Sequence, residues 1–443
     1  MLFGVARTFM NAVRGGIVVP VIGLCAALAA CGTMHIDTAP TATSERAYAA
    51  LYPYYAELCA VSEFKKKPGF DFALSSGIGG HAVLYLNGVC REENAHYPTV
   101  RMCGDATPPD QRGVGLSVNA HYRNANWVAT PGRDFFYHGT LKPGEALTRE
   151  SYARTLARAK AMKIFDGVQF HPEVFDDKPD GMSRQDYEYA VSVPTDYAIN
   201  FGRDRYCARV PVARAAMVRI VAYLNDVNAV YKDGRQEFNW DIFRNNCSHL
   251  AHNALAIAGV WPAWATEQFF LFALFDFPVP KNEFVNLMRR TNDMPIQDLD
   301  AVLDDDAARE ALLQRDTLPT RPGSLAEAEL VVQDNAVYDT NLSLIFYDEP
   351  IFGTYQEHFD RIFAEPRYTN LQANLRHFAA FYRAIEHDRQ PLASFLARHD
   401  AATPSHREAL TQGYDRYYCY IYREESRVAG ALAGLHNWRM PLT

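Results

Sequence analysis

Residues 240–264 read WDIFRNNCSHLAHNALAIAGVWPAW, and this stretch predicts a buried helix that begins at a cysteine. Asn245 or Asn246 is a natural N-cap for a helix that starts at Cys247. Gly259 occupies the position where a left-handed residue ends a helix. Apolar residues recur with the spacing of one helix face, as in a helix packed on a core: Leu250, Ala254, Ile257, Ala258 and Trp261.

The position of Cys247 has a chemical consequence. A thiol is a useful nucleophile as thiolate, and a helix N-terminus stabilises negative charge through its unpaired N–H groups and its dipole. The same N–H groups can receive the oxyanion of an acyl-transfer intermediate. The pattern therefore offers Cys247 as a nucleophile, with Asn246 in the oxyanion region. A buried core cysteine has the same spacing, so that alternative stays open.

A histidine that could serve as the base lies much earlier in the chain. Residues 79–86 read GGHAVLYL and place His81 at the mouth of a buried strand. The glycines before it leave room for close approach. A Cys–His pair raises the thiolate fraction, and the imidazolium can then protonate a leaving group. A histidine that bonds a nearby backbone group is the alternative.

These two motifs, GGHAVLYL and NNCSHLAHNAL, resemble those of the permuted papain-like cysteine hydrolases. That group includes the permuted NlpC-type peptidases and the lecithin–retinol acyltransferase-like enzymes. The resemblance covers about residues 70–264 and implies an antiparallel sheet packed on helices. It implies His81 as base, Cys247 as nucleophile and Asn246 as the residue before it, without a cofactor. The substrates it implies carry an amide or acyl-ester bond, in a peptidoglycan peptide or a lipid.

The resemblance also implies a polar residue on the strand after the histidine strand, where it orients the imidazole. Residues 113–122 read GVGLSVNAHY and alternate between an apolar and a polar face. Asn119 and His121 both lie on the polar face. We favour Asn119 as the third catalytic residue.

Zinc binding is the rival chemistry for the helix segment. Cys247, His249 and His252 lie close together, and a thiolate with imidazoles is a common zinc ligand set. On a helix of 3.6 residues per turn, however, His249 points about 200° away from Cys247. The fourth ligand would come from a histidine elsewhere: His81, His121 or His171. A non-catalytic scaffold of the cell envelope is a third class of function.

Residues 1–30 have the character of a bacterial export signal. Two arginines precede the apolar run 16–27, which is shorter than the roughly 20 residues that span a bilayer. Residues 28–32 read LAACG and resemble the lipobox of bacterial lipoproteins. The resemblance implies cleavage before Cys31, a diacylglycerol thioether on its sulfur and an acylated amino terminus. We therefore expect a lipid-anchored lipoprotein, with a plain secretory signal as the alternative.

The residue after the lipidated cysteine, Gly32, gives no reason for retention in the inner membrane. We therefore expect the protein to face the periplasm from the outer membrane. Its formal net charge is −8, and it has no basic block beyond residues 65–67, so nucleic-acid binding is not expected.

The length of 443 residues suggests two domains after the signal, and 48% hydrophobic residues supply a core. We expect a flexible tether over residues 31–43, an α+β papain-like domain over 44–290 and a mainly helical C-terminal domain over 291–443. Local patterns predict strands at 82–86, 113–122, 126–136 with a Pro–Gly turn, 187–193 and 197–201. They predict helices at 151–164, 211–225, 299–315, 324–332, 368–387 and 392–399.

Six cysteines follow Cys31, and disulfides are permitted outside the cytoplasm. Cys90 and Cys103 flank a loop that they could close, although the sequence does not fix the pairing. If Cys247 stays reduced, an odd number remains. At least one further thiol is then unpaired.

Overall fold

The computed structural model describes residues 42–75, 80–242, 245–266, 279–342, 354–399 and 403–439. The export signal, Cys31 and most of the predicted tether therefore lie outside the described residues, as does Gly79 of the histidine motif. His81, Asn119 and Cys247 lie within them. No helix in the described ranges is both long and apolar enough to cross a membrane.

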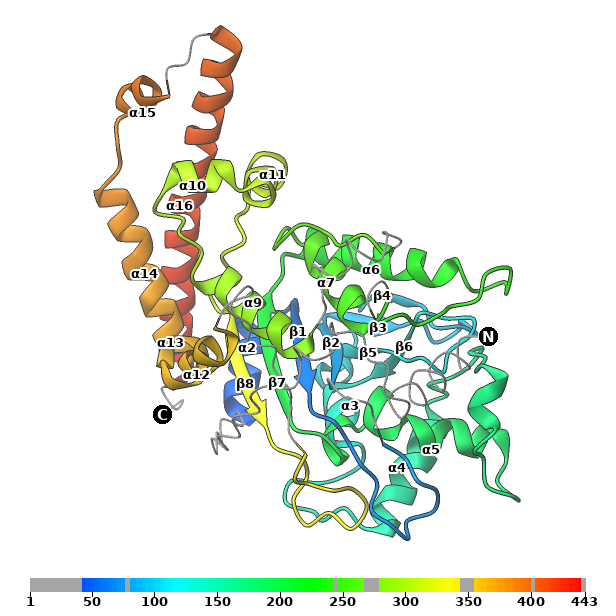
Figure 1. Cartoon of the computed structure of the whole chain (residues 1–443). Coiled ribbons are helices and arrows are strands. Elements are labelled where there is room, and N and C mark those ends of the chain that lie inside the picture. The colour runs from blue at the N-terminus through cyan, green and yellow to red at the C-terminus, as the bar shows by residue number, and fades with distance from the viewer. Residues whose placement is uncertain are drawn as a thin grey trace, which may run out of the picture. The chain divides into compact units, whose positions relative to one another are not determined.

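A six-stranded antiparallel sheet forms the centre of the fold, in the order β6-β5-β2-β1-β7-β8 (Figure 1). Helices cover the sheet, so the predicted α+β class is confirmed. The strands are β1 Tyr55–Val61, β2 His81–Asn87, β5 Gly113–Val118, β6 Trp127–Pro131, β7 Arg205–Pro211 and β8 Leu325–Glu329. A separate two-stranded ribbon joins β3 Val89–Arg91 to β4 Val100–Met102.

The strands alternate their side chains between two apolar layers. Leu58, Leu84 and Leu116 belong to the main core, which α6 (Arg214–Ala229), α7 (Cys247–Ile257) and α9 (Pro280–Asn292) cover. Val83 and Tyr85 on the opposite face belong to a second cluster. That cluster includes residues of α2 (Ala42–Leu51), α3 (Arg133–His138) and η3 (Ile199–Phe201).

Two neighbouring helices lie beside the sheet, and the second of them contacts η3 and β5 (Figure 1). They are α4 (Arg149–Ala161) and α5 (Arg184–Asp196). Three short 3₁₀ turns complete this part: η1 Pro109–Gln111, η2 Pro172–Phe175 and η3.

The C-terminal region is mainly helical and has an apolar core of its own around Phe378, Tyr382 and Ile421. Its strand β8 nevertheless pairs with β7 and completes the sheet at one edge. The sheet therefore draws on residues from both sides of the boundary expected near residue 290. The helices are α10 Leu299–Asp304, α11 Asp306–Arg315, α12 Tyr355–Ala364, α13 Pro366–Thr369, α14 Leu371–His387, α15 Leu392–Arg398 and α16 Pro404–Arg439.

Four local predictions are wrong. Residues 187–193 and 197–201, expected as strands, lie instead in helix α5 and at the turn η3. The prediction failed because the periodicity of a short apolar run does not distinguish a strand from a buried helix. The return strand expected before residue 136 is helix α3 instead, and Gly132 precedes it with a φ of 81°. Residues 325–329 (LAEAE) favour a helix by composition, yet pairing with β7 makes them a strand.

Two disulfides are present among the described residues. One closes the predicted loop between Cys90 and Cys103, and the other joins Cys59 of β1 to Cys207 of β7. Cys247 and Cys419 are free thiols. The prediction that a further thiol remains unpaired besides Cys247 is therefore confirmed.

Candidate active site

Cys247 is the first residue of α7, as its spacing predicts. Asn246 is the N-cap, and its side-chain oxygen accepts hydrogen bonds from the backbone N–H groups of Ser248 (2.9 Å) and His249 (3.3 Å). Gly259 follows the helix with a φ of 78°, which a glycine adopts without strain. The local sequence thus fixes both ends of the helix that carries the thiol.

The sulfur of Cys247 lies against the strand that begins with His81. The backbone N–H of Ala82 donates to Cys247 Sγ at 3.4 Å, and α7 packs on β2 and β5. Two bonds separate the Ala82 nitrogen from the Cα of His81, so the sulfur lies within about 6 Å of that Cα. Folding therefore brings together two motifs that are 165 residues apart.

The thiol and the imidazole approach the sheet from different faces. Cys247 belongs to the core that contains Leu84, whereas His81 shares the face of Val83 by strand alternation. The ladder between β2 and β5 ends at the pair Leu84–Leu116. The site therefore lies where these two strands stop pairing, at one end of the sheet.

A hydrogen-bond chain fixes the tautomer of His81. Ser117 Oγ donates to the carbonyl oxygen of Thr195 at 2.7 Å and lies 3.0 Å from His81 Nε2. A serine hydroxyl has one proton, so Ser117 must accept from an Nε2–H group. In the neutral ring this leaves Nδ1 as the unprotonated nitrogen. His81 is therefore arranged to accept a proton at Nδ1.

Asn119, the residue favoured for orienting the imidazole, bonds to the end of α5 instead. Its side-chain amide donates to Asp196 Oδ2 (3.0 Å) and to Thr195 Oγ1 (3.2 Å), and its oxygen accepts from the N–H of His121. The contact with His81 comes from Ser117, two residues earlier on the same face. Sequence reasoning missed Ser117, although the alternation of residues 113–122 contained the signal.

The remaining polar candidate on that strand, His121, contacts other groups. Its ring packs at 6.0 Å from the ring of Phe170. Burial, and then the nearby His171, lower its pKa to about 4. No hydrogen bond joins the side chain of His121 to His81 within the described residues.

Burial controls the charge of the central pair. Cys247 and His81 are each 9% exposed. Burial raises the pKa of the Cys247 thiol, against smaller opposing effects of the Ala82 and Ser248 N–H groups and of Arg203. Burial also lowers the pKa of His81 to about 3, and the charge of Arg203 acts in the same direction. At neutral pH the thiol and the imidazole are therefore both neutral.

Arg203 is a residue of this site that sequence reasoning did not identify. It is 1% exposed, and its guanidinium lies 4.7 Å from the ring centroid of Phe64. Its Nε and Nη1 have no hydrogen-bond partner in the described structure. Burial lowers the pKa of Arg203 to about 9, so the group still carries its charge at neutral pH. The mixture of aromatic and charged residues in 196–205 was its one sequence signal.

The proposed zinc ligands do not converge. The described residues contain no group of three or more His, Cys, Asp or Glu side chains that could hold a metal ion. Both ring nitrogens of His252 have other partners, Glu283 and the carbonyl oxygen of Pro262, each at 2.8 Å. The ring of His252 also stacks on Trp264, with centroids 3.7 Å apart. These contacts give His252 a structural role.

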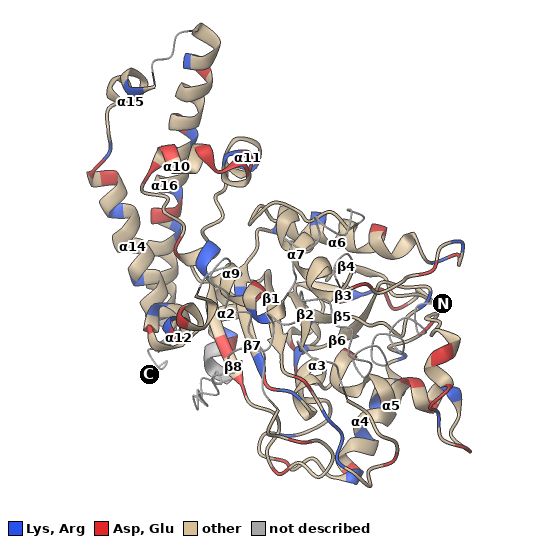
Figure 2. Cartoon of the chain, in the orientation of Figure 1, with Lys and Arg blue, Asp and Glu red and all other residues tan. Residues whose placement is uncertain are grey.

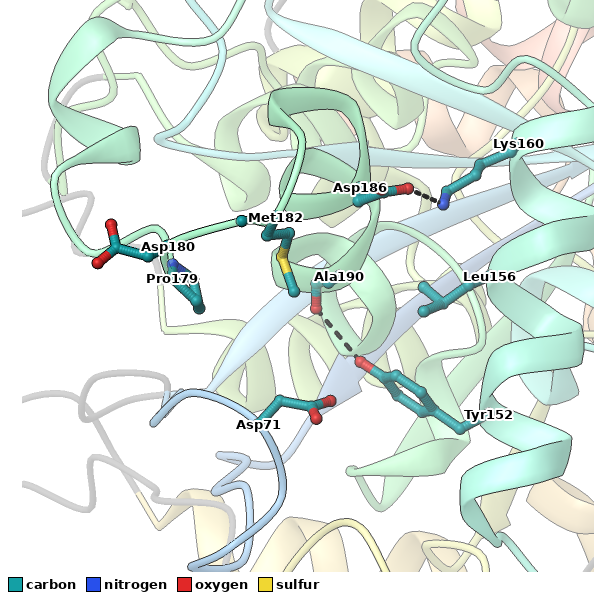
Figure 3. A pocket seen from close by; sticks show the side chains of 10 residues that line it. Asp71, Tyr152, Leu156, Lys160, Pro179, Asp180, Met182, Asp186 and Ala190 are labelled. Carbon is teal, nitrogen blue, oxygen red and sulfur yellow. Dashed lines mark hydrogen bonds and ion pairs between the residues drawn. The ribbon is translucent and has the colours of Figure 1, made fainter.

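An open pocket lies away from the thiol, between α4 and α5 (Figure 3). Its volume is about 450 Å³, and Tyr152, Leu156 and Met182 form part of its wall. Across it, Tyr152 donates to the carbonyl oxygen of Ala190 at 3.3 Å. Neither Cys247 nor His81 lines this pocket.

Comparison of the chain with protein-family models, with curated proteins and with solved structures finds no match. The function must therefore be argued from the residues themselves.

Proposed function

We propose that this protein is a thiol hydrolase of an amide or acyl-ester bond. Cys247 acts as nucleophile, and His81 acts first as base and then as acid. The observation that carries the proposal is the hydrogen-bond chain from His81 through Ser117 to Thr195, from which we infer an Nδ1 able to accept a proton. The residue after this histidine, Ala82, bonds the free thiol.

The reaction needs no group beyond the chain and water. The thiol proton moves to His81 Nδ1 while the sulfur attacks the substrate carbonyl carbon. The backbone N–H of Cys247, at the start of α7, is one donor to the resulting oxyanion. When the tetrahedral intermediate collapses, the imidazolium gives its proton to the leaving amine or alcohol. Water then attacks the thioester, releases the acid and restores the thiol.

The arrangement supports a permuted papain-like fold for this part of the chain. The histidine begins a strand of an antiparallel sheet, and the cysteine follows later at the start of a helix after an asparagine. Ser117, on the strand paired with β2, takes the position expected for the polar residue that orients the imidazole. A serine with this task also fits the described bond to Thr195, because its oxygen can donate and accept.

We also propose that lipid on Cys31 anchors the protein to the outer membrane, facing the periplasm. There it could reach peptidoglycan peptides and lipids, the two substrate classes that the family resemblance implies. Metabolic labelling with a radioactive or alkyne-tagged palmitate tests the anchor. We expect label in the full chain and none in Cys31→Ser, and label that persists in this variant would contradict the anchor.

The hydrolase proposal is tested with activated esters and with peptidoglycan fragments, using the full chain in detergent. We expect an acyl adduct on Cys247 in the intact mass spectrum, followed by turnover. Cys247→Ala and His81→Gln are expected to abolish turnover, while Cys419→Ala, which removes the second free thiol of the described residues, retains it. A chain that forms no adduct with either substrate class, or turns over without Cys247, would refute the proposal.

A further inference from the structure

Arg203 lies at the same end of the sheet as the thiol and the imidazole. Arg205 of β7 pairs with Val61 of β1, and Val61 pairs with His81 of β2, so these three residues form one row across the sheet. Arg203 precedes that row by two residues, and its guanidinium packs against Phe64, just after β1. The fold thus places a buried cation at the same end of the sheet as the start of α7, where Cys247 lies.

The surroundings of Arg203 do not compensate its buried positive charge with an ion pair. Burying an arginine is costly unless carboxylates or hydrogen-bond acceptors surround it. Two of its nitrogens have no such partner, and no ion pair of Arg203 is found within the described residues. The charged and titratable groups that interact with it are Cys247 of α7, Asp196 of α5, His81 of β2, Tyr338 and Glu63.

None of the other groups around Arg203 supplies a better counterion than the thiolate. Asp196 is itself buried, and its pKa is raised by that burial, while its Oδ2 accepts from Asn119. Tyr338 is buried, and burial raises the pKa of its phenol far above neutrality. The carboxylate of Glu63 forms no ion pair with Arg203 within the described residues, and its charge has the smallest effect of the four groups that raise the pKa of Arg203. The sulfur of Cys247 has the largest effect of the four, and it becomes negative during the proposed reaction.

His81 does not supply a resting positive charge. Its imidazole is buried, and Arg203 opposes its protonation, so it is neutral at physiological pH. The usual picture of a thiolate paired with an imidazolium therefore does not describe the resting site. Arg203, by contrast, is positively charged at rest, and its charge favours the thiolate form of Cys247.

We propose that Arg203, rather than an imidazolium at His81, is the cation that stabilises the negative charge on Cys247. This deepens the proposed function and rests on it for its catalytic meaning. The proton of the thiol still moves to His81 Nδ1, and Arg203 keeps its own protons throughout. Arg203 is thus a positioning residue that acts through the sulfur. By opposing the positive charge on His81, it also favours return of the proton to the leaving group.

The test is the rate at which iodoacetamide alkylates Cys247 as a function of pH, in the full chain carrying Cys419→Ala. An opposite charge within about 4–6 Å shifts a pKa by about one to three pH units. In Arg203→Gln we expect the midpoint of the profile to rise by about one pH unit or more, which slows alkylation at pH 7 about tenfold. Arg203→Lys, which keeps a charge, should recover part of that rate. An unchanged midpoint in Arg203→Gln would overturn the proposal.

A second variant keeps the proposal testable if Arg203→Gln does not fold. His81→Gln should leave the midpoint of the profile within about 0.3 pH units of the parent, because a neutral imidazole contributes no charge. A rise of a full pH unit in His81→Gln would identify the imidazolium as the counterion and overturn the proposal.

The outcome is distinguishable from failure of the hydrolase proposal. Alkylation reports the electrostatics of the sulfur, whereas acyl-adduct formation reports hydrolysis. A shifted midpoint in Arg203→Gln without any acyl adduct would support the role of Arg203 and refute the hydrolase. An acyl adduct together with an unshifted midpoint in Arg203→Gln would support the hydrolase and refute the role of Arg203.

Discussion

Arg203 and Arg205 are two residues apart and equally buried, but they differ in how many hydrogen-bond and ion-pair partners their guanidinium groups have. Arg205 donates to Asn200 (2.9 Å) and to Glu327 (3.0 Å), and it also pairs with Glu329. Arg203 has two nitrogens without a partner. A buried guanidinium that is paired with carboxylates stabilises the fold, whereas one without an ion pair can still interact with a group that becomes charged during a reaction. The comparison separates a stabilising region of this protein from its candidate site.

The stabilising region is a buried ionic network on the face of the sheet opposite α7. Glu327 of β8 accepts from Arg133, Arg205 and Arg209, and Glu57 of β1 accepts from Arg133 and Arg209. Acidic residues of β8 and basic residues of β7 thus lie on neighbouring strands (Figure 2). The arginines lower the pKa of Glu327 and of Glu57 despite their burial.

The largest effect is expected from breaking this network. Glu327→Ala leaves three buried guanidinium groups short of one carboxylate, and losing one member of a buried ion pair costs about 3–5 kcal/mol. Urea unfolding measures the change in the free energy of unfolding. Glu310→Ala removes a more exposed pair with Arg315 and should cost about 0–1 kcal/mol. Equal costs for the two variants would show that the network does not stabilise the fold.

The pH dependence of stability should be the next effect in size. The pKa of His81 is about 3 in the folded chain and 6.5 in an unfolded one, so below pH 6.5 the unfolded state takes up a proton that the folded state refuses. The contribution of His81 to the free energy of unfolding is therefore complete above pH 6.5. It falls by about 1.4 kcal/mol per pH unit as the pH decreases toward 3. His121 acts in the same direction.

The measurement is urea unfolding between pH 6.5 and 4.5, above the range in which Glu57 and Glu327 contribute. Because the folded pKa of these carboxylates is lowered, their contribution is lost only as the pH falls below about 4.5. His81→Gln should flatten the dependence in this window. A slope equal to that of the parent chain would contradict a neutral, buried His81.

The smallest change in stability, with a large change in activity, is expected for Ser117→Ala. The lost hydrogen bonds should cost about 1 kcal/mol of stability. Without Ser117 the tautomer and orientation of His81 are no longer fixed, so hydrolysis should fall by about tenfold or more. Asn119→Ala, which leaves the Ser117–His81 contact in place, is the matched control. A larger loss of turnover in Asn119→Ala than in Ser117→Ala would restore Asn119 as the orienting residue.

Local features of the sequence predicted the parts of the site that depend on local structure. The cap at Asn246, the apolar stripe and Gly259 define α7, and the apolar run after His81 defines β2. The loop that Cys90 and Cys103 flank suggested their disulfide, although the sequence left the pairing open.

Features that depend on tertiary pairing were not predictable in this way. Ser117 and Asn119 share one strand face, and only the position of β5 against β2 decides which of them reaches His81. Several groups around Arg203 come from distant segments, so a single sequence does not reveal that the residue lacks an ion pair in the described structure. The strand character of residues 325–329 follows from their arginine partners on β7, against the helical preference of alanine and glutamate.

The place of Glu327 near the end of the chain bears on the timing of folding. Synthesis proceeds from the amino end, so Arg133, Arg205 and Arg209 all emerge before the acid that neutralises them. Until then their acidic contacts are Glu57 and the half-exposed Glu45. A nascent chain that stops near residue 290 would enclose surplus positive charge on closing its sheet. We therefore expect closure to wait for the last third of the polypeptide, as a late, long-range event.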